Sequence, residues 1–588
     1  MPQQDTDEQL TKMRHSAAHL LAAAVQQLRP EAKPAIGPAI EHGFYYDFDC
    51  GEQPISEKDL KQLEQKMREL LAGWTAFTRR EVTAEQAREL FKDNPYKLEL
   101  IDEIMARGET ITVYTAGGFT DLCRGGHVEN PSQELGAFKL LSVAGAYWRG
   151  DENKPMLTRI LGALFPSQDE LQDHLQRLED AKGRDHRALG KALDLFTFSP
   201  LVGSGLPLFT PRGTIIRREL QRWLDELQLP RGYMPVTIPH LAKADLYRTS
   251  GHWEKFKDDL FHVRGRTDEE LVLKPMNCPH HTQLYAAQLR SYRDLPYRTM
   301  ETTTVYRDEQ GGELLGLARV RSITQDDAHV FCRPNQIGTE VALMMDMVKA
   351  FYAAFDFSLI VHLSVRDEAT PDKYLGDDHL WHEAERQLAG ALKAHGQQYT
   401  RREGEAAFYG PKIDYLTRDV LDRTWQLATV QLDFNMPQRF GLTYVDERGA
   451  RRQPVMIHRA ILGSFERFLA LLLEHYAGRL PLWLAPVQVA ILPMADDQVN
   501  FAQETAQTLR HVGVRAEVDS RAESIGKKIR EAEQRRVPVM FVIGKREAAA
   551  GHVAVRTHEK GDAGARPLAA AVAAVVSAVR ERGAAAEI

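Results

Sequence analysis

The sequence predicts an α+β protein of several domains. Three observations support this prediction: the length of 588 residues, a polar β-hairpin near the middle of the chain and an alternation of strands and helices near its end. At roughly 150 residues per domain, the length suggests about four domains. The apolar content of 43% and the charged content of 27% are ordinary for globular proteins.

Composition excludes several classes of protein. The opening MPQQDTDEQL has no apolar segment, so it is not a secretory signal, and no stretch approaches the roughly 18 apolar residues of a membrane span. Four scattered cysteines fit a reducing cytoplasm better than a disulfide framework. Because the net charge is −7, any nucleic-acid contact must use local basic surface. We therefore expect a cytoplasmic protein without a membrane partner.

The first expected element is a helix from about Glu8. His15 and His19 are four residues apart on it, so both imidazoles project from one face. Cys123 and His127 repeat this spacing farther along the chain. One cysteine and three histidines suffice to bind zinc, although on spacing alone unrelated buried histidines and a buried cysteine explain the pattern equally well. The first pair lacks the glutamate of HExxH, which disfavours a metalloprotease.

The central hairpin spans residues 303–329. We expect a strand ending near Tyr306, a glycine-containing loop and a second strand from about Ala318. Alternation would place on one face of the second strand Arg319, Arg321, Gln325, Asp327 and His329. This face is too polar for a packed core, so it either binds a polar ligand, with arginine suited to phosphate, or is a solvated hairpin.

Three stretches of this hairpin resemble motif 2 of the class II aminoacyl-tRNA synthetases, in the form typical of threonyl-tRNA synthetases. They are Arg307-Asp308-Glu309, Gly316-Leu-Ala-Arg319-Val-Arg321 and Gln325-Asp-Asp327-Ala-His329. The resemblance covers about residues 10–560. It implies activation of L-threonine by ATP to threonyl-adenylate, followed by transfer to tRNA(Thr). Residues 232–239 match the loose motif 1 pattern, which lies at the dimer interface in this class, so the resemblance also implies a homodimer.

The resemblance assigns roles to the ATP side of the core. Arg307 would stabilise charge on the α-phosphate, and Mg²⁺ would accompany ATP. Residues 463–468 resemble motif 3 and contribute Arg467. The implied ATP-binding residues are Arg307, Glu309, Arg319, Gln426 and Arg467.

A zinc site is also implied by the resemblance. Cys278, His329 and His458 would hold one Zn²⁺ per subunit and leave a fourth position open. A local site of Cys278 with His280 or His281 is the alternative suggested by spacing. The implied threonine-binding residues are Gln325, Asp327, Tyr409, Lys412 and Gln431. His252 matches a family histidine proposed as proton acceptor during transfer to tRNA; a surface histidine is the simpler interpretation.

The HxxxH and CxxxH pairs resemble the editing domain shared by threonyl- and alanyl-tRNA synthetases. This implies hydrolysis of mischarged seryl-tRNA(Thr). The implied pocket residues are His15, His19, Lys97, Asp121, Cys123 and His127. The quartet holds zinc in the alanyl relatives and is regarded as metal-free in the threonyl ones, so we assign no metal to it. Only fourteen residues precede His15, and we expect the N-terminal TGS domain of most bacterial relatives to be absent.

Near the end of the chain, residues 487–492, 514–518 and 537–543 predict three strands separated by helices. Five cations between Lys527 and Arg536 form either a solvated helix face or an RNA-binding surface. The region resembles the anticodon-binding domain of class IIa synthetases. Glu547 and Arg556 match positions that read anticodon bases there.

The predicted domains are an editing domain at 1–165, a linker helix at 166–190, a class II catalytic core at 191–480, with an antiparallel sheet flanked by helices, and an α/β anticodon-binding domain at 481–588. Two rival functions are an aminoacyl-tRNA hydrolase that keeps its core only for tRNA binding and a non-catalytic RNA-binding regulator. Both predict loss of the motif 2 or motif 3 arginines, yet Arg307, Arg319 and Arg467 are all present.

Overall fold

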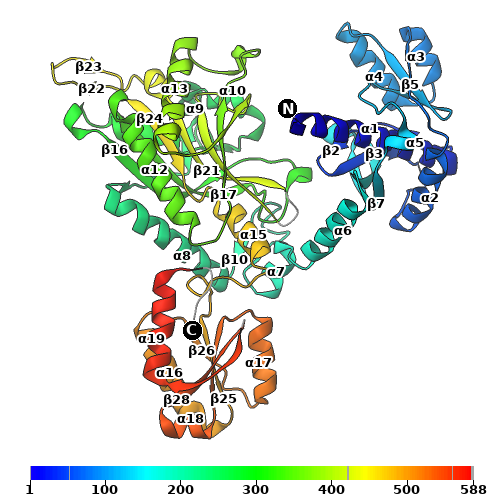
Figure 1. Cartoon of the computed structure of the whole chain (residues 1–588). Helices are drawn as coiled ribbons and strands as arrows, with labels where there is room; N and C mark the ends of the chain where they lie inside the picture. Colours follow the sequence, from blue (N-terminus) through cyan, green and yellow to red (C-terminus); the bar gives the residue numbers. More distant parts are fainter. Residues whose placement is uncertain (1, 52, 152, 420–422, 559, 584–588) are drawn as a thin grey trace. The chain divides into compact units, whose positions relative to one another are not determined.

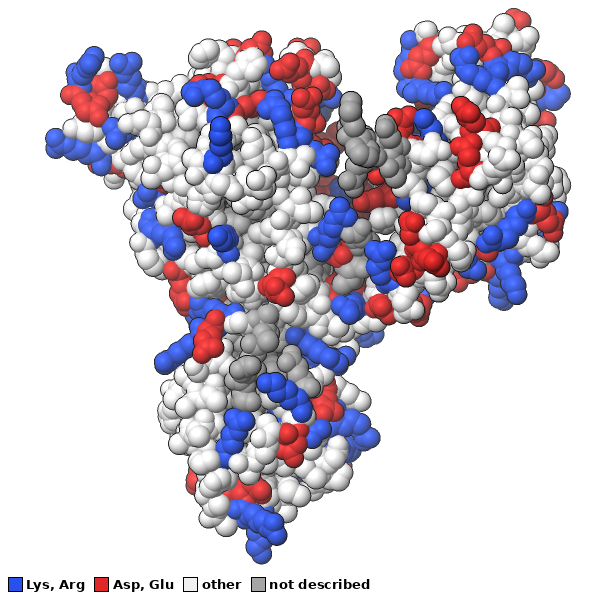
Figure 2. Space-filling model, viewed as in Figure 1, with Lys and Arg blue, Asp and Glu red and all other residues white. Residues whose placement is uncertain are grey.

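The computed structural model describes residues 2–51, 53–151, 153–419, 423–558 and 560–583. They form two compact units, Met1–Glu179 and Asp180–Ile588 (Figure 1), each with its own buried apolar core. Within these described residues, none of the helices combines the length and the apolar character needed to cross a membrane. On the face drawn in Figure 2, positive and negative side chains are interspersed.

The first unit is built on α1 (Pro2–Leu28), whose buried Leu20, Leu21 and Val25 pack toward β3 and α2. Its larger sheet has the order β1-β3-β8-β7, with β2 paired to β3, and its smaller sheet has the order β4-β5-β6. The strands are β1 (Lys33–Pro34), β2 (Ala39–Ile40), β3 (Gly43–Asp49), β4 (Thr78–Glu81), β5 (Thr112–Ala116), β6 (Phe119–Leu122), β7 (Ala137–Tyr147) and β8 (Met156–Phe165). The other helices are α2 (Leu60–Leu71), α3 (Ala84–Leu90), α4 (Pro95–Ala106), α5 (Pro131–Glu134) and α6 (Gln168–Lys182), which continues into the second unit.

The second unit is organised around an eight-stranded sheet in which only the edge strands β11 and β19 run parallel to their neighbours. In spatial order the strands are β11 (Met234–Pro235), β16 (Tyr297–Tyr306), β17 (Ser322–Cys332), β24 (Val455–Ala460), β21 (Thr424–Asp433), β20 (Lys412–Arg418), β18 (Ile360–Val365) and β19 (Thr400–Glu403). This confirms the predicted antiparallel core.

Helices and smaller strands surround this sheet (Figure 1). The helices are α7 (His186–Ala192), α8 (Pro211–Gln228), α9 (Ala244–Ser250), α10 (His252–Lys255), α11 (Cys278–Ala286), α12 (Ile337–Tyr352), α13 (Asp378–Ala394), α14 (Asn435–Arg439) and α15 (Phe465–His475). The smaller strands are β9 (Phe196–Thr197), β10 (Leu208–Phe209), β12 (Leu241–Lys243), β13 (His262–Arg264), β14 (Glu270–Leu273), β15 (Arg290–Ser291), β22 (Tyr444–Val445) and β23 (Arg451–Arg452).

The two faces of the large sheet differ in chemistry. The direct partners across β16, β17, β24, β21 and β20 are Thr299, His329, His458, Gln431 and Lys412. Their neighbours along the strands, such as Val330, Ile457 and Val430, belong to the main apolar core. Because successive residues of a strand point to opposite faces, one face is packed and the other carries a polar row.

The central hairpin differs from its prediction in one respect. The second strand begins at Ser322, not near Ala318, so Arg319 and Arg321 lie in the loop between β16 and β17. A tight turn at residues 315–319 replaces the expected start of the strand, and Gly316 has the positive φ of 50° that such a turn favours. The prediction of a strand there was therefore wrong.

The C-terminal part of the second unit has a five-stranded sheet of order β26-β25-β27-β28-β29. Its strands are β25 (Val489–Pro493), β26 (Ala516–Val518), β27 (Val539–Ile543), β28 (His552–Thr557) and β29 (Gly561–Pro567). Its helices are α16 (Val499–His511), α17 (Ile525–Gln534), α18 (Lys545–Ala550) and α19 (Leu568–Glu581). The three predicted strands are confirmed within two residues, and the first of them is central because it pairs with both of the others.

A buried carboxylate connects the large sheet to α15. Asp326 on β17 accepts hydrogen bonds from the backbone N–H groups of Ile461 (2.8 Å), Leu462 (3.0 Å) and Gly463 (2.8 Å). The Arg459 guanidinium donates to the same carboxylate over 3.0 Å. Burial raises the pKa of Asp326 to about 6 despite these partners. The carboxylate therefore positions the loop from which α15 begins.

Replacing Asp326 with alanine should lower the free energy of unfolding of the second unit by about 3–5 kcal/mol, since it leaves a buried guanidinium and several N–H groups unpaired. Calorimetric or chemical unfolding measures this change. Asp346→Ala is the matched control, because that carboxylate is 57% exposed and lies 3.2 Å from His395 Nε2; it should change stability by less than about 0.5 kcal/mol. Similar losses in the two variants would contradict the role given to Asp326.

Candidate active sites

The polar row of the large sheet brings two histidines together. His329 on β17 and His458 on β24 are direct partners in the ladder, and His329 Nε2 lies 3.1 Å from His458 Nδ1. Cys278 begins α11, and potential ligand atoms of all three side chains lie within 4.8 Å of one another. All three residues are buried. The predicted ligand set, drawn from three remote segments, thus forms one cluster.

Two further side chains orient these histidines. Asp433 Oδ2 lies 2.9 Å from His458 Nε2, and His281 Nδ1 lies 2.7 Å from His329 Nδ1. A carboxylate or imidazole behind a ligating histidine fixes its ring and tautomer. Asp433 was not among the predicted site residues, although it lies two residues beyond Gln431 on the same strand. His281 therefore contacts a candidate ligand and is not itself in the ligand group that the described residues form.

The donor set fits zinc. Burial raises the pKa of the Cys278 thiol well above its usual range and lowers the pKa of His329 well below it, so without a cation both groups are neutral. One sulfur and two imidazole nitrogens are the donors that zinc prefers, and a divalent cation converts such a thiol to a thiolate. A three-residue set leaves one position for a ligand.

Predicted threonine-binding residues border this cluster. Asp327 lies two residues before His329 on β17 and accepts a 2.9 Å hydrogen bond from Asn277 Nδ2. The Tyr409 ring lies 4.8 Å from that of His458, and its hydroxyl donates to Gln431 Oε1. These residues therefore form a polar group beside the candidate metal site.

At the other end of the polar row, Lys412 Nζ lies 2.5 Å from Asp414 Oδ2. Gln426 Nε2 donates to Asp414 Oδ1 over 2.8 Å. Asp414, which the sequence analysis did not identify, therefore links a predicted threonine-binding residue to a predicted ATP-binding one. Gln325 is placed by a bridge to Ser464, next to the start of α15.

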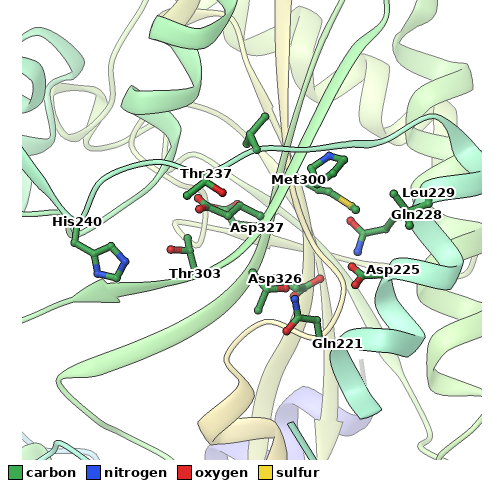
Figure 3. A pocket seen from close by; sticks show the side chains of 14 residues that line it. Gln221, Asp225, Gln228, Leu229, Thr237, His240, Met300, Thr303, Asp326 and Asp327 are labelled. Atoms are coloured by element: carbon green, nitrogen blue, oxygen red, sulfur yellow. The ribbon is translucent and has the colours of Figure 1, made fainter. Parts of the chain in front are cut away.

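A cavity of about 480 Å³ lies between α8 and strands β16 and β17 (Figure 3). Asp327, Thr303 and Glu301 line it from the sheet, and Gln221, Asp225 and Gln228 line it from α8. Glu301 is the direct ladder partner of Asp327, so the two carboxylates lie side by side. The cavity therefore gives Asp327 an acidic surrounding that favours a cationic group.

Three arginines meet near the hairpin loop. Burial lowers the pKa of Arg307, and burial together with the charges of Arg307 and Arg319 lowers the pKa of Arg467. Arg307 Nε has no hydrogen-bond partner among the described residues, and its guanidinium lies 5.1 Å from the centre of the Phe256 ring. Arg319 pairs with Glu309 at 2.7 Å. A partly unpaired group of like charges is stabilised by an anion.

His252 is fully buried, so the interpretation as a surface histidine was wrong. Its Nδ1 lies 2.8 Å from Ser250 Oγ, and its Nε2 lies 3.7 Å from Cys278 Sγ. Burial lowers the pKa of His252 to about 3. At neutral pH the ring is therefore uncharged and can accept a proton.

Four of the six residues predicted for the editing pocket form a second cluster in the first unit. His15 Nε2 lies 3.5 Å and His127 Nε2 lies 3.3 Å from Cys123 Sγ. His19 completes the group, with its ring centre 4.7 Å from that of His127. Potential ligand atoms of the four residues lie within 4.8 Å of one another, so this group could also hold a metal.

Behind this quartet lies a buried network of charged and polar groups. Lys97 Nζ pairs with Asp121 and lies 3.1 Å from the hydroxyl of Tyr46, which donates to Asp121 Oδ2 over 2.5 Å. Asp121 is 3.6 Å from His19 Nδ1. Tyr46 was not predicted as a site residue; it lies on β3. The network therefore places a buried carboxylate close to His19.

The titratable groups of the quartet are neutral at pH 7. Burial lowers the pKa of His15, lowers that of His19 strongly and lowers that of His127 to about 2. Burial also raises the pKa of the Cys123 thiol to about 11. Neutral imidazoles carry one donor and one acceptor each, so the group can orient a water molecule.

In the C-terminal sheet, the two predicted base-reading residues occupy separate elements. Glu547 lies in the first turn of α18, where Gly544 N donates to its carboxylate over 3.1 Å. Arg556 lies on β28, 3.6 Å from Glu533. The basic helix α17 is not simply a solvated face, because Lys528 is buried and donates to Pro493 O over 2.9 Å.

Three family descriptions match the chain. They are "Threonyl and Alanyl tRNA synthetase second additional domain" at residues 111–160, "tRNA synthetase class II core domain (G, H, P, S and T)" at 261–476 and "Anticodon binding domain" at 488–578. Each match falls on a part of the fold that carries one of the predicted sites.

Curated relatives cover nearly the whole chain. A threonine–tRNA ligase of Gloeobacter violaceus is 48% identical over 97% of this chain and 92% of its own length. One of Thermus thermophilus is 47% identical over 97% of this chain and 89% of its own length. Among solved structures, the RNA binding domain of threonyl-tRNA synthetase from Cryptosporidium parvum Iowa II is similar with a TM-score of 0.64 and 36% identity, over 68% of this chain and 99% of that one.

The thiol of Cys123 should react slowly with iodoacetamide in the folded, chelator-treated protein. With a pKa of about 11, about one thiol in a thousand is ionised at pH 8, against roughly a quarter for an ordinary cysteine. Mass spectrometry of the Cys123 peptide should show alkylation at least about tenfold slower than in the urea-unfolded chain, the internal control. Equal rates in the two states would contradict a buried, neutral thiol.

Proposed function

We propose that this chain, which belongs to the threonine–tRNA ligases of the class II aminoacyl-tRNA synthetases, charges threonine on the large sheet and removes serine errors in its first unit. Membership of this family implies ATP, L-threonine and tRNA as partners. The observation that carries the assignment of residues is the convergence of Cys278, His329 and His458 beside the arginine group.

In the activation step, the threonine carboxylate attacks the α-phosphorus of ATP and pyrophosphate leaves. Arg307 would bind the α-phosphate and stabilise the charge that develops on it; its burial and its unpaired Nε support this role. Arg319 and Arg467 would hold the outer phosphates together with Mg²⁺. Glu309 would lie near the adenine, held by Arg319, and Gln426 would complete the nucleotide pocket from the Asp414 network.

Threonine would be selected at the metal cluster. Cys278, His329 and His458 would hold one zinc ion per subunit, oriented by Asp433 and His281. When bound, zinc would supply open coordination for the amino and hydroxyl groups of threonine. Asp327, which lines the cavity, would accept a hydrogen bond from the amino group. Residues that would complete the pocket are Gln325, Tyr409, Lys412 and Gln431.

In the transfer step, the tRNA ribose hydroxyl attacks the carbonyl carbon of threonyl-adenylate and AMP leaves. His252 would accept the hydroxyl proton, since its ring is neutral at pH 7 and its Nδ1 is held by Ser250 Oγ at 2.8 Å.

Editing is needed because the synthetic site discriminates only weakly between threonine and serine. Valine lacks the hydroxyl and would leave the open position unfilled, whereas serine lacks only a methyl group, worth about 1–3 kcal/mol. The first unit would therefore hydrolyse seryl-tRNA(Thr): water adds to the ester carbonyl carbon, the bond to the ribose oxygen breaks, and that oxygen takes a proton. The residues that would orient the water are His15, His19, Lys97, Asp121, Cys123 and His127. We assign no metal to this site.

The remaining proposals concern organisation. The boundaries would be 1–165 for editing, 166–190 for a linker helix, 191–480 for the core and 481–588 for anticodon binding, where Glu547 and Arg556 would read bases. A homodimer through residues 232–239 is supported by the exposed side chain of Met234 within that stretch and those of Leu229 and Leu241 beside it. The free thiols of all four cysteines support a reducing cytoplasm.

ATP–pyrophosphate exchange with threonine, serine and valine tests the synthetic site. Zinc-loaded protein should exchange with threonine, about 10–200-fold less efficiently with serine and almost not at all with valine. Arg307→Ala should abolish exchange, and Cys278→Ser should bind less zinc than the roughly one ion per chain of the parent. Valine that works as well as serine would contradict the hydroxyl sensor, and absence of exchange with every amino acid would favour a hydrolase or a regulator.

The double variant His15→Ala/His19→Ala tests the first unit. It should retain threonylation and accumulate seryl-tRNA(Thr), because the residues that orient the hydrolytic water are gone. Aminoacylation with labelled serine measures this accumulation. His174→Ala is the matched control, since it removes another buried histidine of the same unit, outside the quartet. If serine fails to accumulate, or does so equally in the control, the role of the quartet is wrong.

A further inference from the structure

The loop between β16 and β17 ends in a tight turn that sits between two of the arginines. Ala318 N donates to Leu315 O over 2.8 Å, and Leu315 pairs with Arg319 as an isolated bridge. Arg319 therefore leaves the turn directly. On the other side, Arg467 Nε donates to Ala318 O over 3.1 Å. The position of this turn sets the positions of both guanidinium groups.

A buried histidine from a different segment holds the tip of this turn. The backbone N–H of Leu317, a fully buried residue, donates to His186 Nε2 over 3.1 Å. His186 Nδ1 lies 2.7 Å from Glu474 Oε1, near the end of α15. The carboxylate accepts the Nδ1 proton, which leaves the Nε2 lone pair for Leu317 and fixes a single tautomer.

The contact between His186 and the turn is close enough to require glycine. A Cβ atom on Gly316 would lie 2.3 Å from His186 Nε2 and 2.8 Å from Arg187 Cγ. Gly316 also has a φ of 50°, a conformation that residues other than glycine rarely adopt. The turn is therefore shaped to the imidazole, and His186 at the start of α7 connects it to the far end of α15.

We propose that His186 is a positioning residue for ATP: through Leu317 it sets the turn that places Arg319 and Arg467 at the outer phosphates. The inference rests on the proposed function, which assigns these two arginines to ATP. His186 contacts neither guanidinium through any hydrogen bond among the described residues, so it acts through the backbone of the turn. Losing its acceptor should weaken ATP binding and leave threonine binding unchanged.

Two substitutions of His186 separate its hydrogen bond with Leu317 from its hydrogen bond with Glu474. His186→Gln can place an amide oxygen near Nε2 and still accept from Leu317, whereas His186→Asn places its amide near Nδ1 and reaches only Glu474. In threonine-dependent ATP–pyrophosphate exchange, His186→Asn should raise the KM for ATP about tenfold, the effect of leaving one buried N–H unpaired. His186→Gln should stay within about threefold of the parent, and the KM for threonine should change in neither.

Two further variants change the residues on either side of His186, namely Gly316 in the turn and Glu474 on α15. Gly316→Ala should raise the KM for ATP as His186→Asn does, and it keeps the inference testable if His186→Asn does not fold. Glu474→Gln keeps an acceptor for Nδ1 and should leave this KM nearly unchanged. His174→Asn, another buried histidine, controls for a general loss of stability.

The outcomes distinguish this inference from the proposed function. A parent protein without exchange would refute the function itself. With an active parent, a fall in kcat at constant KM for ATP in His186→Asn and Gly316→Ala would show a purely structural role and overturn the inference. An unchanged KM in both variants, or an equal rise in His186→Gln, would also overturn it.

Discussion

The register of the large antiparallel sheet is the constraint on which the rest of the second unit depends. Because β17, β24, β21 and β20 are in register at this point, His329, His458, Gln431 and Lys412 fall in a single row. A slip of one residue between β17 and β24 would move a histidine into the apolar core and a valine or isoleucine onto the site. The same strand pairing therefore places the apolar residues in the core and the polar residues at the site.

Both candidate sites are groups of ionisable side chains that burial keeps neutral or leaves unpaired. In the first unit imidazoles and a thiol surround a space suited to water, backed by the Lys97–Asp121 pair. In the second, burial and the like charges of Arg307 and Arg319 lower the pKa of Arg467, and Arg307 Nε has no hydrogen-bond partner among the described residues. Such arrangements cost stability in the free protein and are relieved when the ligand binds.

The two units complement each other chemically. A site that recognises a hydroxyl group rejects valine strongly, because a buried polar group would remain unsatisfied, but it discriminates weakly against serine. A second site that hydrolyses the product can distinguish serine from threonine better, because it can admit the smaller serine and exclude the extra methyl group of threonine. The order of the domains along the chain matters less than the presence of both chemistries in one protein.

The sequence by itself predicted the α+β class, the central hairpin and the three C-terminal strands, because hydrophobic periodicity and turn residues are local properties, and its resemblance to a known family supplied the candidate site residues and the order of the domains. It did not reveal Asp433, His281 or Tyr46, whose importance comes from neighbours brought close only by strand pairing. It also misplaced the start of the second hairpin strand and treated Lys528 and His252 as candidates for the surface. Burial and strand register depend on segments that lie tens of residues apart or more, so only the tertiary structure decided them.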